Sequence, residues 1–292
     1  MSLGKNQQSR PRIKAKNLLA TKRKSIQVLA QKKITFSKFG MFNKQERLRK
    51  KRKKLFRKLQ KYSDEHRDAA SKNLCERKKT PSRTEIINYL LARSSGETNY
   101  LEIGVRNPDD NYTHIIADHK FSVDPGLEFE SNPVDFKLTS DAFFEQLSQG
   151  QILSPDIQFD VIFIDGLHLA DQVDRDIKNS LKYLKPKGFI ALHDCNPPTE
   201  WHARENYAYQ YTPATGLWNG TTWKAFVKWR SDTTLQSCCV DTDWGVGIFS
   251  KGQPIGDSIT GENPYFEYSE FSNKRKHFLN LVSFEELADK LA

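Results

Sequence analysis

The stretch that most constrains the fold is FDVIFIDGLH at residues 159–168, in which an apolar run stops abruptly at an Asp-Gly pair. A second apolar run, at residues 188–192, stops in the same way at a His-Asp pair. Short apolar runs bounded by turn residues are typical of strands buried on both faces, as in a parallel sheet. Ligands bind beyond the carboxyl ends of such strands. Four polar side chains are therefore predicted to meet at one edge of a sheet: Asp165, His168, His193 and Asp194.

Strand-like and helix-like segments alternate through the middle of the chain. The expected strands are residues 100–104, 121–123, 135–138, 159–164, 189–192, 235–240 and 246–250. The expected helices are residues 85–93, 112–119, 142–148, 170–184, 222–230 and 283–291. Such alternation predicts an α/β fold with a mostly parallel sheet. The last two strands flank Asp241–Gly245 so closely that they predict a final antiparallel hairpin.

The charge of the chain is divided very unevenly. The net charge is +10 overall, yet residues 1–60 carry 21 Lys/Arg and one acid, for a net +20, and the other 232 residues carry a net −10. Thr80-Pro81-Ser82 provides a helix cap and marks the expected start of the main domain. We expect a basic, partly helical extension over 1–79, the main domain over 80–255, and a C-terminal extension packing on it over 256–292.

The partner of the basic extension is left open by its composition. A net +20 attracts polyanions, so RNA, an anionic membrane surface and an acidic protein are the candidates. Within residues 1–60 four phenylalanines are the only aromatic residues, which argues weakly for base stacking. The alternative is a solvated, poorly ordered segment that aids solubility or localisation.

Four cysteines without a CxxC pair indicate reduced thiols, and we expect a cytoplasmic protein. No run reaches the length of a membrane span, and the N-terminus lacks the apolar core of a secretory signal. An organelle transit peptide is the alternative for residues 1–38, which are basic and free of acids. The sequence does not predict an oligomeric state.

The first predicted strand ends at Gly104, where the chain can turn tightly and its backbone can approach a ligand. Asp124 lies twenty residues further on, at the end of the next strand, where an acid is placed to accept hydrogen bonds from ribose hydroxyls. The complete GxGxxG motif is absent. This spacing predicts a nucleoside-containing cofactor, but it does not separate NAD from S-adenosylmethionine.

Three further features resemble class I S-adenosylmethionine-dependent methyltransferases over about residues 81–251: Ser140-Asp141, Asp165 and the closing hairpin. The YLEIGV, IDGLH and HD motifs are most similar to the subgroup that methylates hydroxyls of sugars and natural products. The resemblance implies a Rossmann-like seven-stranded sheet. It also implies a cofactor site in which Glu102 and Gly104 shape the methionine pocket, Asp124 binds the ribose and Asp141 binds the adenine amino group, with Ser140 and Asp165 nearby.

Metal-dependent members of this subgroup hold Mg²⁺ after the fourth and fifth strands, which implies Asp165, His193 and Asp194 as ligands here and His168 as the general base. A cation lowers the pKa of a sugar hydroxyl while an imidazole accepts its proton. His193 stands where those members have an oxygen ligand, and imidazole suits Mn²⁺ better than Mg²⁺. The alternatives are that Asp165 only caps a helix and that His168 is a hydrogen-bonded loop residue.

An aromatic and polar segment follows the fifth predicted strand and is expected to form a substrate loop. Trp201 and Trp218 are its candidate substrate contacts, whereas Trp223, Phe226 and Trp229 are expected to pack in the core. The favoured function is methyl transfer from S-adenosylmethionine to a hydroxyl of a sugar or other small molecule. One alternative is an RNA methyltransferase that grips phosphate with the basic extension. The other is a non-catalytic binding module with a degenerate cofactor site.

Overall fold

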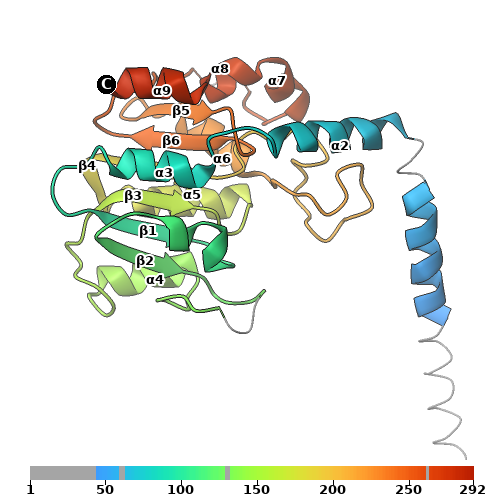
Figure 1. Cartoon of the computed structure of the whole chain (residues 1–292), viewed down its shortest axis with the longest axis horizontal. Helices are drawn as coiled ribbons and strands as arrows, with labels where there is room; N and C mark the ends of the chain where they lie inside the picture. Colours follow the sequence, from blue (N-terminus) through green and yellow to red (C-terminus); the bar gives the residue numbers. More distant parts are fainter. Residues whose placement is uncertain (1–43, 59–62, 129–131, 261–262) are drawn as a thin grey trace, which may run out of the picture. The chain divides into compact units, whose positions relative to one another are not determined.

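The computed structural model describes residues 44–58, 63–128, 132–260 and 263–292 (Figure 1). The chain divides into two compact units, Met1–Tyr62 and Ser63–Ala292. In the first unit, residues 44–58 form a helix, and the expectation of a poorly ordered segment before it falls outside the described residues. The second unit begins before the predicted domain start at Thr80, because the helix α2 (Asp64–Glu76) belongs to it and Asn73 accepts a hydrogen bond from the indole of Trp244 at 3.0 Å.

One sheet of seven strands forms the centre of the second unit, counted over its described residues, in the order β2-β1-β3-β4-β6-β5-β7 (Figure 1). The strands are β1 (Asn99–Ile103), β2 (His119–Val123), β3 (Phe159–Ile164), β4 (Leu184–Leu192), β5 (Gln236–Val240), β6 (Val246–Ser250) and β7 (Leu281–Val282). The pairs among β2, β1, β3 and β4 are parallel, and β6 is antiparallel to both β4 and β5. The predicted mostly parallel, seven-stranded sheet with a final antiparallel hairpin is confirmed.

The predicted strand at residues 135–138 is wrong, and the seventh strand of the sheet is one that was not predicted. Residues 135–138 contribute only a single bridge, between Val123 and Phe136. The side chain of Asp135 accepts hydrogen bonds from the backbone N and the Oγ of Ser122 at 2.9 and 2.6 Å, so a carboxylate takes a donor that a longer ladder would use. The seventh strand is instead β7, which pairs in parallel with β5 within the region expected to be loop and helix.

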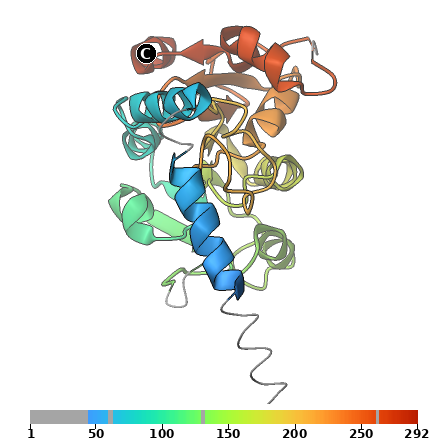
Figure 2. The same cartoon turned by 90° about the vertical axis from the view of Figure 1, so that its right-hand side faces the viewer.

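Helices cover both faces of the sheet (Figures 1 and 2). One face packs on α3 (Arg83–Leu91) and α9 (Phe284–Leu291). The other packs on α4 (Ser140–Ser148), α5 (Ala170–Ser180), α6 (Thr222–Trp229), α7 (Tyr268–Asn273) and α8 (Arg275–Leu279). Successive strand residues serve opposite faces: Val161 and Phe163 contact the first layer, and Ile162 and Ile164 the second. This burial on both sides explains the continuous apolar runs in the sequence.

The predicted helix over residues 112–119 is wrong, since two short 3₁₀ turns, Pro108–Asp110 and Tyr112–His114, occupy this region. The side chain of Asn111 is buried and bonded to Glu102 and Thr84, so it does not cap a following helix. The other expected helices form, with α5 ending at Ser180 because β4 begins at Leu184. Within the described ranges, no helix has the length and apolar character needed to cross a membrane.

Candidate functional site

The parallel register of β3 and β4 brings the two polar strand ends together. Ile164 pairs with Leu192, so Asp165 and His193 leave neighbouring strands at the same level. Asp194 follows with φ 62°, a left-handed conformation that few residues other than glycine adopt. Its Oδ1 atom accepts a hydrogen bond of 2.5 Å from Asn219, whose importance the sequence did not indicate. The predicted meeting of these strand ends is therefore present.

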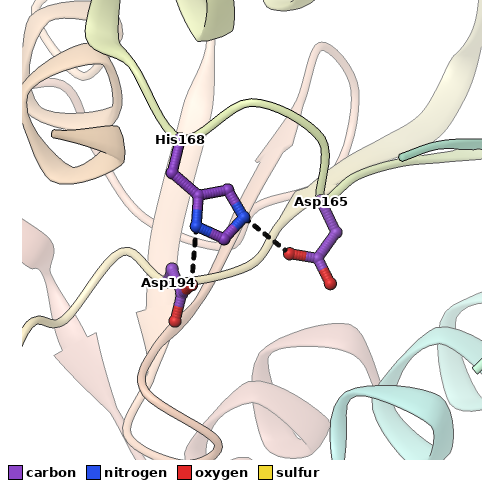
Figure 3. A group of neighbouring side chains, drawn as sticks. All are labelled: Asp165, His168 and Asp194. Carbon is purple, nitrogen blue, oxygen red and sulfur yellow. Dashed lines mark hydrogen bonds and ion pairs between the residues drawn. The ribbon is translucent and has the colours of Figure 1, made fainter. Parts of the chain in front are cut away.

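His168 bridges two carboxylates in this group (Figure 3). Its Nε2 atom lies 3.1 Å from Oδ1 of Asp165, and its Nδ1 atom lies 3.0 Å from Oδ2 of Asp194. The side chains of His168 and Asp165 are 17% and 19% exposed. A carboxylate at each nitrogen fixes the orientation of the imidazole ring.

A second histidine, His193, lies beside the first. Its Nδ1 atom is 3.2 Å from Oδ1 of Asp165, and its Nε2 atom is 3.3 Å from Oδ1 of Asp243. Arg83, at the start of α3, donates to Oδ2 of Asp243 from its backbone N at 3.0 Å and from Nη1 at 3.1 Å. Neither Arg83 nor Asp243 was predicted. The start of α3 and the turn between β5 and β6 come to this edge of the sheet only through tertiary packing, which the sequence pattern does not show.

The charges of this group determine its protonation. Burial alone would lower the pKa of His168, but Asp194 and Asp165 raise it to about 10. The pKa of His193 lies well above its ordinary value, because the charges of Asp165 and Asp194 outweigh its burial. Burial would raise the pKa of Asp165, yet His193 and His168 hold it below its usual range. Both imidazoles therefore carry a proton at neutral pH in this arrangement.

Two glycines allow the loops of the site to approach each other. Gly104, at the end of β1, has φ 95°, and a Cβ atom there would lie 2.3 Å from Cα of Gly166. Gly220 has φ 62°, and a Cβ atom there would lie 2.1 Å from the carbonyl oxygen of His168. Both positions require glycine for conformation and for space. Gly104, predicted at the cofactor, therefore sets how closely the loops after β1 and β3 pack.

The predicted cofactor residues of β1 and β2 lie at adjacent strand ends. Glu102 is 3% exposed, and its Oε2 atom accepts hydrogen bonds from the Tyr100 hydroxyl at 2.6 Å and from Asn111 at 2.9 Å. Burial raises the pKa of Glu102 to about 7 despite these two bonds. Asp124 accepts from the backbone of Gly126 at 2.6 Å and from Asn132 at 3.1 Å.

The predicted adenine-side residues begin α4. Ser140 accepts a hydrogen bond of 3.1 Å from Gln172, and Asp141 forms an ion pair of 3.2 Å with Arg175. Both partners come from α5, and the Asp141 side chain is 47% exposed. The side chains of these two residues thus contact α5. Their role in binding the cofactor stays a prediction.

The aromatic segment after β4 contacts the histidine through one tryptophan. The Trp218 ring stacks on the His168 ring with centroids 5.3 Å apart and planes 18° apart. Its indole N–H donates to the carbonyl of Arg204 at 2.6 Å, and Tyr207 packs on its ring with centroids 5.2 Å apart. Trp201 joins the same segment through its carbonyl, which accepts from Arg204 at 2.6 Å. Trp218 is thus brought to the site, and Trp201 to its supporting loop.

Three side chains lie close enough together to surround a metal ion. One ligand atom from each of Asp165, His168 and Asp194 lies within 4.8 Å of the other two. His193, predicted as a ligand with the two aspartates, has its nitrogen atoms against Asp165 and Asp243 instead. The two carboxylates fit Mg²⁺ or Mn²⁺, whereas an imidazole that keeps its proton has no free lone pair for a metal.

A family model described as a methyltransferase domain matches residues 91–195. The matched range contains β1 to β4 and the whole Asp165, His168 and Asp194 group. Over this part of the chain it agrees with the motifs that resemble class I methyltransferases. No curated protein matches the chain.

Several solved methyltransferase structures are similar to the chain at low identity. An O-methyltransferase from Bacillus cereus, in complex with SAH, is 15% identical with a TM-score of 0.35, over 67% of this chain and 94% of that chain. TomG from Streptomyces achromogenes, in complex with SAM, is 13% identical with a TM-score of 0.32, over 65% and 90%. MycE, in complex with Mg, SAH and mycinamycin VI, is 14% identical with a TM-score of 0.37, over 61% and 51%.

Proposed function

We propose that this protein transfers the methyl group of S-adenosylmethionine to a hydroxyl of a small molecule such as a sugar. The observation that carries the proposal is the convergence of Asp165, His168 and Asp194 at the carboxyl ends of β3 and β4, inside the range that matches a methyltransferase domain. Methyl transfer from a sulfonium needs chiefly an aligned acceptor and a group that takes its proton.

In this proposal the cofactor occupies the ends of β1 and β2. Gly104 supplies close backbone approach, Glu102 borders the methionine end and Asp124 accepts from the ribose hydroxyls. Asp124 is already oriented by Gly126 and Asn132, so little reorganisation is needed for it to bind ribose. Ser140 and Asp141 border the adenine.

His168 is the proposed general base, and the two aspartates determine when it can act. An imidazole flanked by two carboxylates holds its proton tightly, as its pKa of about 10 indicates. It becomes a base at neutral pH when positive charge offsets Asp165 or Asp194. The same two carboxylates are the proposed ligands of a divalent cation, either Mn²⁺ or Mg²⁺. Such a cation would supply the charge that acidifies the acceptor hydroxyl.

The acceptor is proposed to lie against the aromatic loop. The Trp218 ring stacks on His168 and also packs against the ring of Tyr207. An aromatic surface therefore adjoins the proposed base. Aromatic rings pack well on the apolar faces of sugars and on planar rings. Trp201 belongs to the same loop and is the second proposed substrate residue.

The test is methyl transfer from S-adenosylmethionine labelled on its methyl group, with pooled sugar and natural-product acceptors in one reaction and RNA in another. The proposal expects S-adenosylhomocysteine to accumulate with the small-molecule pool and with Mn²⁺ or Mg²⁺ present. Asp124→Asn should reduce turnover at low cofactor concentration, and Asp156→Asn, at an exposed loop position, should not. Labelling of RNA alone would overturn the choice of acceptor, and loss of activity in both variants would overturn the role of Asp124.

A further inference from the structure

The described helix of the first unit is an unusually dense array of cations. Residues 44–58 carry ten Lys/Arg and one acid: Lys44, Arg47, Arg49, Lys50, Lys51, Arg52, Lys53, Lys54, Arg57 and Lys58, with Glu46. All fifteen residues except Phe56 are exposed. The ion pair between Lys50 and Glu46, at 3.0 Å, neutralises one of the ten charges. The methyl-transfer chemistry proposed above uses none of these residues.

The cations point in every direction around the helix axis. Residues advance by about 100° each along an α-helix. Lys44, Lys51 and Lys58 therefore share one face, while Arg49 and Lys53 lie on the opposite face. The apolar residues are Leu48, Leu55 and Phe56, and Arg52 projects between the two leucines and Phe56. The helix has no continuous apolar side.

This distribution favours nucleic acid over a membrane surface. A helix that lies in a bilayer interface buries a broad apolar face, and a flat anionic surface meets only one side of the charges. Nucleic acid can meet several sides, because a single strand wraps and the major groove of B-form DNA admits a helix. Fifteen residues rise about 22 Å, a length over which duplex DNA carries about 13 charges, close to the ten cations.

Repulsion within the helix favours binding of a polyanion. Like charges four residues apart weaken a helix, and Arg47 with Lys51, Lys50 with Lys54 and Lys54 with Lys58 are such pairs. A bound polyanion removes this repulsion, so binding should also stabilise the helix. We propose that residues 44–58 form a nucleic-acid-binding helix that attaches the chain to the phosphate backbone without reading the base sequence. This inference does not depend on the proposed methyl transfer.

The experiment uses fluorescence anisotropy of the full chain without cofactor, with labelled oligouridylate and a DNA duplex of equal length. The helix variant replaces Lys50, Lys51, Lys53 and Lys54 with Gln. The control variant makes the same charge change on the second unit at exposed Lys137, Lys178, Lys182 and Lys187. Wild-type affinity should fall steeply between about 50 and about 200 mM KCl.

The helix variant should bind at least one of the two probes roughly tenfold or more weaker at low salt, and its salt slope should be smaller by roughly 3. The control variant should remain within about twofold of the wild type for that probe. A preference for the single strand or the duplex identifies the kind of nucleic acid. Equal losses in the two variants would overturn the proposal, as would absence of binding at low salt. Tighter binding to phosphatidylserine vesicles than to either probe would overturn it in favour of a membrane surface.

Discussion

The Nδ1 atom of His168 lies 3.0 Å from the Oδ2 atom of Asp194, so the loop after β3 is joined to the loop after β4 at the proposed reaction centre. Further contacts reinforce this junction. Gly220 packs on the carbonyl of His168, and Asn219 beside it donates to Asp194. The segment that carries the aromatic rings is therefore anchored to both members of the pair.

Replacing the imidazole should remove the proposed base without removing the cofactor site. In His168→Gln, the rate of S-adenosylhomocysteine formation should fall by about 100-fold or more, the usual contribution of a general base. Affinity for S-adenosylmethionine should stay within about twofold. His119→Gln is the matched control, because His119 is exposed and lies at the start of β2, whereas the site lies beyond the carboxyl end of that strand. A variant at residue 168 with the wild-type rate would show that another group accepts the proton.

The protonation of His168 should respond to positive charge at the two aspartates. In ¹⁵N NMR titrations its midpoint should lie near pH 10 without added cation, because Asp194 and Asp165 favour the charged ring. Saturating Mg²⁺ should lower that midpoint by offsetting the carboxylates. Asp194→Asn should lower it without any cation. A midpoint near the ordinary histidine value in the cation-free wild type would contradict the described pairing.

Glu102 should make stability depend on pH in a definite direction. Its pKa is about 7 in the folded chain, against 4.5 for a freely solvated glutamate, so the folded state binds more protons between these values. Stability should therefore fall as pH rises from about 4.5 to about 7, by about 3 kcal/mol from this group.

The measurement is urea unfolding of the wild type and Glu102→Gln at several pH values. Relative to the wild type, the variant should gain stability as pH rises through this range and then level off. Glu145→Gln, at an exposed position of α4, is the matched control for removing a carboxylate charge. A stability difference between Glu102→Gln and the wild type that stays constant with pH would contradict the raised pKa of Glu102.

The contact between Gly104 and Gly166 should be sensitive to a single methyl group. Gly104→Ala places a Cβ atom 2.3 Å from the Gly166 Cα and forces an alanine to φ 95°, so unfolding free energy should drop by roughly 3 kcal/mol or more. Gly96→Ala has a similar φ of 82° but nothing within 4 Å, and should cost only about 1 kcal/mol. Equal losses of unfolding free energy in the two variants, measured by chemical denaturation, would show that the close approach of Gly104 to Gly166 does not contribute to stability.

Local sequence patterns predicted the parts of the fold that depend on burial and capping. The run at residues 159–164 became β3 with the predicted bounds, and the Ser82 capping box begins α3. The helix prediction for residues 112–119 was wrong because the Asn111 side chain donates a hydrogen bond to Glu102. No local sequence pattern encodes that contact. The strand β7 was missed because two residues are too short to show a period.

The candidate site was predicted where it follows directly from strand ends. Asp165, His168 and Asp194 each lie within a few residues of a strand terminus, and the parallel register then brings them together. Arg83 and Asp243 reach the same place from a helix start and a hairpin turn. Their contribution depends on how separate elements pack, which spacing along the chain does not specify.

The most direct test of the central claim is calorimetric titration of the full chain with S-adenosylmethionine, in the presence of Mn²⁺ and again with a chelator. We predict saturable binding to one site, with Asp124→Asn weakening it by roughly 10-fold or more through loss of a charge-assisted hydrogen bond to the ribose. Asp156→Asn should bind as the wild type does. Absence of binding under both conditions would contradict the proposed methyl transfer.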